Sequence, residues 1–181
     1  MGLFSRKTPR VELPPAIVAA LELTRGERVL AFAVDDTTGA HVVATAYALL
    51  VVSSAAGTSS GQSAVRRRWL SVDAGAWQPE TATLTVTWAD GGRAAQWCFG
   101  DQQTLLPETV RERVQTSVVL STRLNLGDRR TGRVAIRQDL ATRELIPQTI
   151  LGRYTRADDP EVQAHVQAAL AHLRDQVGLP A

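Results

Sequence analysis

Residues 65–99 read VRRRWLSVDAGAWQPETATLTVTWADGGRAAQWCF and contain all four tryptophans and the only cysteine of the 181-residue chain. At their centre the sequence alternates strictly: threonines occupy one side, and the other side carries Ala82, Leu84, Val86 and Trp88. A period of two with β-branched and apolar residues predicts a half-buried strand. The ADGG stretch at residues 89–92 favours a tight turn. We therefore expect a β-hairpin, with residues 93–99 as its returning strand.

Upstream of this hairpin the sequence predicts one short helix and further strands. Pro14 and Pro15 suit the first turn of a helix. Residues 27–34 carry apolar side chains on both faces, which indicates a strand in a two-sided environment. Residues 41–52 form either two short strands or one bent strand, and residues 65–72 form another. The sequence thus predicts about six strands before Gly100.

After Gly100 the apolar period changes to that of a helix. Spacings of three and four residues predict a helix over residues 107–124. Residues 133–140 and 144–151 are expected to form a second hairpin, whose returning strand lies at an edge because it contains Pro147.

A last helix is expected after Asp159, which is a suitable N-cap, with Pro160 at the first helical position. Its apolar stripe needs a cover and consists of Val162, Val166, Ala169, Leu170, Leu173 and Val177. We expect this helix to fold back on the protein's own sheet, because a short connection costs little closure entropy. The alternative is a second copy of the chain, which would make the helix a homo-oligomer contact.

The order of strands, the tryptophan-bearing central strands and the helix after the hairpin resemble the bacterial pleckstrin-homology or GRAM-like domains. The resemblance covers roughly residues 27–124 and is one of topology. The usual strand number of that family is seven. It implies an α+β fold in which an antiparallel sheet, a partly open barrel, is closed by an amphipathic helix, here followed by a C-terminal hairpin and helix. Many proteins of this superfold bind or scaffold without catalysis.

These patterns divide the chain into three parts. Residues 1–13 are expected to be a flexible basic lead, and residues 14–127 the pleckstrin-homology-like domain with its short N-terminal helix. Residues 128–181 are expected to add the second hairpin and the last helix, packed on the same domain. Residues 53–64 are rich in Ser and Gly, which is typical of a mobile linker.

The composition favours an intracellular globular protein. The net charge is only +2, although nineteen arginines accompany a single lysine. The N-terminus lacks the apolar segment of a secretory signal. The uncharged run at residues 42–56 is too short for a transmembrane helix. We expect a cytoplasmic protein without a transmembrane segment, with peripheral membrane association as an alternative.

No catalytic or metal-binding motif is evident. The sequence contains no phosphate-binding loop, dinucleotide fingerprint or nucleophile elbow. His165 and His172 lie seven residues apart on the last helix, about 10 Å by helix rise, which is too far for one metal ion. We therefore expect no catalytic residues, no cofactor and no metal, and an active site assembled from distant loops is the remaining alternative. The hypothesis is a non-catalytic binding or scaffolding protein whose partner is another protein.

Arginine clusters offer a second hypothesis. Arg66 and Arg68 fall on one face of a strand and could converge on a phosphate or carboxylate. Residues 123–156 hold eight arginines against three acidic residues, including Arg129, Arg130 and Arg133. These five arginines are the candidate anion- or partner-binding residues, and nucleic acid or anionic lipid is the alternative partner. The opposing interpretation is a solvated, charged surface.

Overall fold

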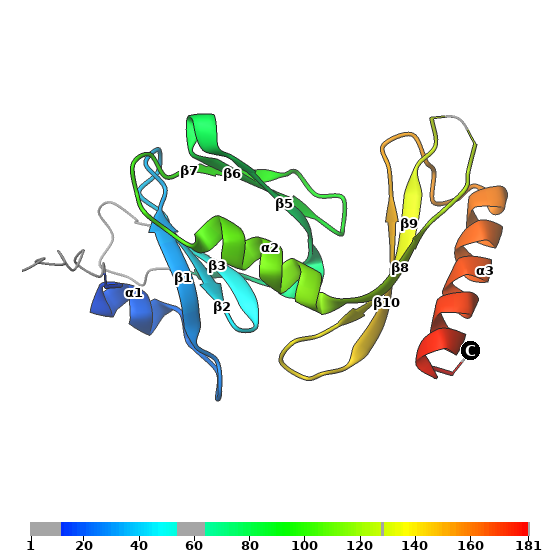
Figure 1. Ribbon diagram of the computed structural model, residues 1–181, viewed down its shortest axis with the longest axis horizontal. Coiled ribbons are helices and arrows are strands. Elements are labelled where there is room, and N and C mark those ends of the chain that lie inside the picture. Colours follow the sequence, from blue (N-terminus) through cyan, green and yellow to red (C-terminus); the bar gives the residue numbers. More distant parts are fainter. Residues whose placement is uncertain (1–11, 54–63, 128, 181) are drawn as a thin grey trace, which may run out of the picture.

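The computed structural model describes residues 12–53, 64–127 and 129–180, and shows an α+β protein with antiparallel sheets (Figure 1). One sheet has the order β1-β2-β3-β4, a second β5-β6-β7 and a third β10-β9-β8, and within these residues none closes into a barrel. The strands are β1 Val29–Val34, β2 His41–Thr45, β3 Ala48–Val52, β4 Ala64–Arg68, β5 Val72–Gln78, β6 Thr83–Trp88, β7 Ala95–Cys98, β8 Val118–Arg123, β9 Gly132–Gln138 and β10 Leu145–Leu151. The helices are α1 Pro15–Ala20, α2 Leu106–Ser117 and α3 Pro160–Val177, and short 3-10 turns occupy η1 Trp69–Ser71 and η2 Pro79–Thr81. The expected lead at residues 1–13 and linker at residues 53–64 fall almost entirely outside the described residues.

The N-terminal body consists of α1, β1–β7 and α2, with α2 packed between the first two sheets (Figure 1). Its main core joins these two sheets to the buried face of α2 and includes Trp69, Leu84, Phe99 and Val110. As the alternation predicts, Leu84 and Val86 of β6 are buried, whereas Thr87 is exposed.

Both faces of the first sheet are buried, as expected for β1. The face away from α2 packs against α1, where Ile17 and Leu21 contact a separate cluster that includes Val43 and Leu50. The two apolar faces of residues 29–34 therefore belong to two different cores, because Ala31 and Ala33 join the first cluster and Phe32 the second.

The C-terminal body consists of β8–β10 and α3, and it has its own apolar cluster (Figure 1). Leu170 and Leu173 of α3 pack on Val134 and Ile136 of β9. The Asp159 carboxylate accepts a hydrogen bond from the Glu161 amide, and Gly178 ends the helix in the left-handed region at φ +68°. The folding-back of this helix is thus confirmed, and so is the second hairpin, with Pro147 in the edge strand β10.

Two predictions from the sequence were wrong in detail. Seven strands precede α2 rather than six, because residues 64–78 form β4, the η1 turn and then β5. The helix expected over residues 107–124 ends at Ser117, and the chain continues directly into β8. The β-branched residues of β8 suit a strand, and the burial of its side chains alternates with a period of two.

Candidate functional site

Arg66 and Arg68 do not converge, although they lie on the same strand. The Arg66 guanidinium donates to the Glu27 carboxylate at 2.8 Å and to the Leu21 carbonyl at 3.0 Å, so it fastens the end of α1 to the first sheet. Arg68 instead pairs with the buried carboxylate of Asp139, which follows β9. Each arginine therefore binds a different part of the protein's own chain.

The Glu27 carboxylate is a buried centre of this first contact. Burial alone raises its pKa, but hydrogen bonds from Arg66, Thr45 and Thr24 outweigh that effect and hold the pKa below its ordinary value of 4.5. The ionised form is thus the one that the fold stabilises. Arg66 acts as a structural partner of this carboxylate.

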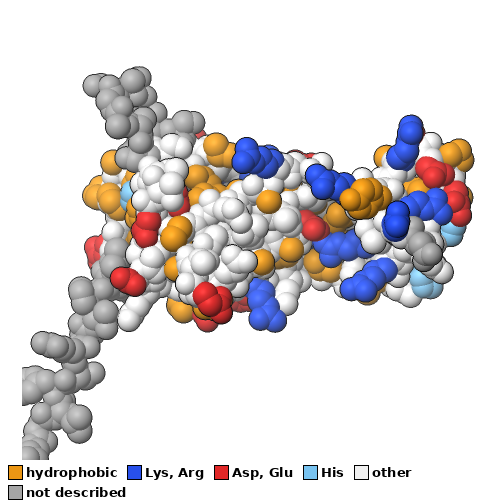
Figure 2. Space-filling model, turned by 90° about the horizontal axis from the view of Figure 1, so that it is seen from above, with side chains coloured by type: hydrophobic (Ala, Val, Ile, Leu, Met, Phe, Trp, Pro, Cys, Tyr) orange, Lys and Arg blue, Asp and Glu red, His pale blue; other side chains and the backbone are white. Residues whose placement is uncertain are grey.

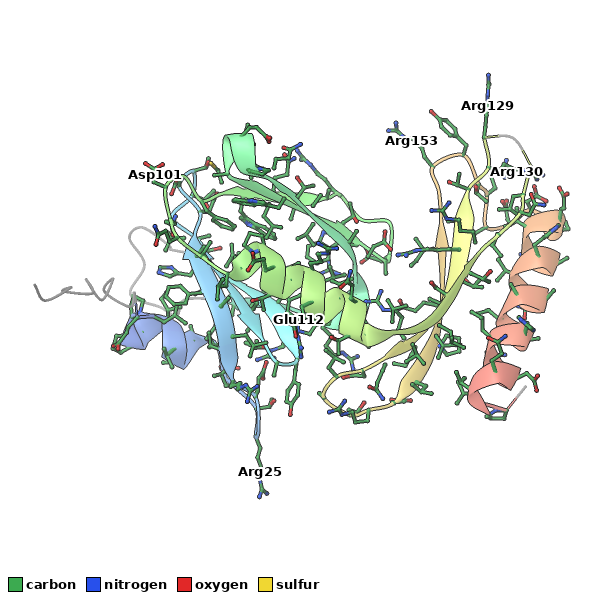
Figure 3. All side chains as sticks on the ribbon, viewed as in Figure 1. Arg25, Asp101, Glu112, Arg129, Arg130 and Arg153 are labelled. Carbon is green, nitrogen blue, oxygen red and sulfur yellow. The ribbon has the colours of Figure 1, made fainter. Side chains whose placement is uncertain are left out.

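Arg129 and Arg130 have different surroundings despite being neighbours. Arg130 pairs with Glu161 at 2.8 Å and Asp159 at 3.3 Å, at the N-terminus of α3. Arg129 is exposed in the left-handed region at φ +64° and makes no ion pair with any residue described in the structure. Arg129 and Arg153 point outward from the same end of the C-terminal body (Figure 3).

A polar seam connects the two bodies, and we define it by the contacts of residues 68–73 with strands β9 and β10 and with Asp139, which follows β9. Arg133 of β9 pairs with Asp73 of β5. Gln148 of β10 donates to the Leu70 carbonyl at 2.9 Å. The Arg68–Asp139 pair belongs to the same seam. Ionic and hydrogen-bonded contacts therefore orient the C-terminal body, together with Leu140, which follows β9 and joins the main apolar core of the N-terminal body.

Arg137 lies in the middle of the polar seam and is completely buried. Its guanidinium donates to the Trp69 carbonyl at 2.8 Å, the Val72 carbonyl at 3.1 Å and the Ser117 hydroxyl. None of these acceptors is a carboxylate, although Ser117 ends α2, where the helix dipole favours a cation. Burial, together with the positive charge of Arg133, lowers the pKa of Arg137 to about 10, so it remains charged at neutral pH.

Beside the polar seam an open pocket of about 490 Å³ lies where β5, α2 and the C-terminal body meet. We call it the junction pocket, and it is lined by Asp73, Ala74, Gly75, Arg111, Val114, Gln115, Val118 and Arg133. Strand β5 pairs only with β6 among the described residues, so one side of the pocket is a sheet edge. The volume lies within the range of small-ligand sites.

Gly75 makes the close approach of α2 and β5 possible. A Cβ atom at this position would lie 2.8 Å from Cγ1 of Val110, which is too close for an unstrained contact. The absence of a side chain therefore lets the helix lie against the strand and sets the shape of the junction pocket.

Positive charge dominates around this pocket. Arg111 and Arg133 line it against one carboxylate, that of Asp73. Arg123 of β8 lies directly opposite Arg133 in the β8–β9 register, so the two side chains share a face of the sheet. Figure 2 shows arginine side chains gathered at the narrow part of the molecule where the two bodies meet. Like charges directly opposite one another destabilise a sheet, unless an anion separates them.

Of this site, sequence reasoning named only Arg133. It missed Asp73, Gly75 and Arg111, which come from a strand that was not expected and from the exposed side of α2. A glycine within a predicted strand is the one signal available, because it can mark a close backbone approach.

Other kinds of site receive no support within the described ranges. Across residues 12–53, 64–127 and 129–180, no group of His, Cys, Asp and Glu side chains has the arrangement of a metal site. His165 and His172 are both exposed on α3. No helix in this part of the chain is long and apolar enough to span a membrane.

Comparison with known proteins gives no indication of function, so the functional proposal rests on the geometry described above. No family model, curated protein or solved structure matches this chain.

Proposed function

We propose that this chain is a non-catalytic binding protein with a pleckstrin-homology-like N-terminal body, and that another protein docks at the junction pocket. Support for the fold comes from the strand arrangement, in which sheets of four and three antiparallel strands are followed by α2. Seven strands before the helix is also the usual number for that family, and β5 is the strand that the sequence pattern omitted.

The observation that carries the proposal is the open junction pocket beside the edge strand β5. An exposed sheet edge offers backbone donors and acceptors to an extended segment of another chain, while an adjacent pocket can select one of its side chains. The pocket is lined by arginine, aspartate, glutamine and apolar residues, with no histidine, cysteine or hydroxyl nucleophile. This composition favours binding over catalysis.

Site-specific crosslinking in the native cell tests this proposal. A photoreactive residue at Gln115, in the pocket, should form a crosslink to a partner protein, whereas one at Gln167, exposed on α3, should not. The captured partner is then purified and its affinity for the full chain is measured. Ala74→Trp, which fills the pocket, should abolish binding, and the exposed control Ala168→Trp should preserve it. Equal crosslinking at both positions, or undiminished binding by Ala74→Trp, would contradict the proposal.

A second candidate function, arginine-mediated binding of nucleic acid or anionic lipid, rests on the end of the C-terminal body. Arg129 and Arg153 project there (Figure 3), and Tyr154 is 72% exposed. Against it, four of the five candidate arginines are paired with carboxylates of this chain. Phosphate contacts weaken steeply with salt. Binding to DNA, RNA or anionic vesicles at low salt, lost at high salt and in Arg129→Gln, would support this candidate, and no binding at low salt would eliminate it.

A further inference from the structure

The junction pocket has an excess of positive charge that the described protein does not neutralise. Two guanidinium groups, those of Arg111 and Arg133, face one carboxylate, that of Asp73. Arg111 is exposed on α2 and makes no ion pair with a described residue. Arg123 lies opposite Arg133 on the same face of the sheet but does not line the pocket. Such an arrangement costs stability in the unbound protein, and an anion in the pocket would relieve that cost.

The charge balance indicates which anion fits. Two arginines and one aspartate leave the pocket lining with one net positive charge. A carboxylate, which carries one negative charge, neutralises it, whereas a phosphate dianion would leave a surplus of negative charge beside Asp73. Asp73 already shows that a carboxylate can bind Arg133 at this place.

We propose that the junction pocket binds an aspartate or glutamate side chain of a partner protein, held by Arg111 and Arg133. This inference rests on the proposed function and specifies what the docking segment must contain. The parts of this chain at residues 1–11 and 54–63 contain no aspartate or glutamate, so neither complements the charge. In this proposal the acidic group comes from another molecule, beside the edge strand β5.

Asp73 then competes with the ligand for Arg133. While the pocket is empty, the Asp73–Arg133 pair satisfies one of the two arginines. Removing the aspartate charge leaves both guanidinium groups to the incoming carboxylate. Asp73→Asn is therefore expected to bind an acidic segment more tightly, which is the opposite of what loss of a direct ligand contact would cause.

A pair of blocked peptides tests the proposal on the full chain. Both are six residues of threonine and valine with one central residue, glutamate in one peptide and glutamine in the other. Binding is followed by the backbone amide signals of Ala74, Gly75 and Gln115 in two-dimensional NMR spectra. The glutamate peptide should shift these signals and bind about tenfold more tightly than the glutamine peptide, because charge-assisted hydrogen bonds are roughly twice as strong as neutral ones.

Matched variants assign the effect to the pocket. Arg111→Gln should weaken the glutamate peptide about tenfold, Arg111→Lys should restore part of the affinity, and Asp73→Asn should strengthen binding several-fold. Arg153→Gln removes the same charge at the far end of the C-terminal body and should change nothing (Figure 3). Amide spectra of each variant confirm that it is folded.

The outcomes separate this inference from the proposed function. Equal affinity for the two peptides, an equal loss in Arg111→Gln and Arg153→Gln, or tighter binding of inorganic phosphate than of the glutamate peptide overturns the carboxylate proposal. If the partner protein crosslinked at Gln115 binds the full chain but not Ala74→Trp, the proposed function stands even though the carboxylate proposal has failed. If that capture also fails, both are wrong.

Discussion

Replacing Arg137 by methionine tests how the two bodies are held together. The Arg137 side chain is completely buried, and its three acceptors come from η1, β5 and α2. Methionine has a similar length but no donor. The substitution would leave the Trp69 and Val72 carbonyls without this charged donor, and the Ser117 hydroxyl with only the hydrogen bond that it donates to the Val114 carbonyl.

The magnitude follows from two opposing contributions. A hydrogen bond to a charged group contributes about 1.5–3 kcal/mol, so the loss of three acceptor contacts costs roughly 4.5–9 kcal/mol. Against this, burial lowers the pKa of Arg137 from 12.5 to about 10. At about 1.4 kcal/mol for each pKa unit, removing the buried charge recovers roughly 3.5 kcal/mol. The net expectation is a destabilisation of about 3 kcal/mol.

Urea unfolding with linear extrapolation measures this difference. Arg123→Met is the matched control, because Arg123 is exposed in the neighbouring strand and faces another arginine. Its unfolding free energy should equal that of the parent protein or exceed it by less than about 1 kcal/mol, because the substitution removes a like-charge pair across the strands. The unfolding free energy of Arg137→Lys should fall between those of Arg137→Met and the parent protein, since lysine keeps the charge but lacks the planar guanidinium. If Arg137→Met is as stable as the parent, the cost of burying the charge equals or exceeds its hydrogen bonds, as occurs for some buried ion pairs, and the reasoning fails.

Three further predictions concern other contacts of the fold. Because the Glu27 pKa is lowered from 4.5 in the folded protein, the stability from its ionised form is present above about pH 4.5 and is lost as the pH falls further. Acid titration of Glu27→Gln should show a flatter decline in unfolding free energy, and an unchanged slope would contradict the assignment. Gly75→Ala should cost about 1–3 kcal/mol, because the new methyl group meets Val110, and Val110→Ala should restore part of it in a double-mutant cycle. Leu173→Ala should cost about 2–5 kcal/mol by thermal or urea unfolding without changing the oligomeric state in sedimentation, and loss of an oligomer at unchanged stability would show that the residue serves an interface between copies.

The elements that could be predicted are those whose local signals agree with their tertiary surroundings. In the β6–β7 hairpin, alternation, β-branched residues and turn glycine all favour the same structure, and Gly91 indeed has φ +73°. In α3, the cap at Asp159, the first-turn proline and the apolar stripe agree in the same way. Sequence alone is sufficient in such regions, because no distant contact has to overrule it.

Strand β5 could not be predicted for the converse reason. Its sequence, VDAGAWQ, is poor in β-branched residues, and aspartate and glycine are disfavoured in strands. Gly75 is required by the close approach of α2, which is a tertiary constraint. The same cause hid the junction pocket, since Asp73 and Gly75 acquire their meaning only from a helix more than thirty residues away in sequence.

The arginines of residues 123–156 have two kinds of surroundings in the structure, and the composition of the segment does not distinguish them. Arg130 and Arg137 bind groups of this chain, and they fix α3 and the polar seam respectively. Arg133 serves both purposes, because it pairs with Asp73 and also lines the junction pocket. A cation used inside the fold has partners in fixed positions, whereas one available for recognition is exposed beside an opening, as Arg111 is. The proposed carboxylate ligand would therefore be recognised by the few arginines that line the junction pocket.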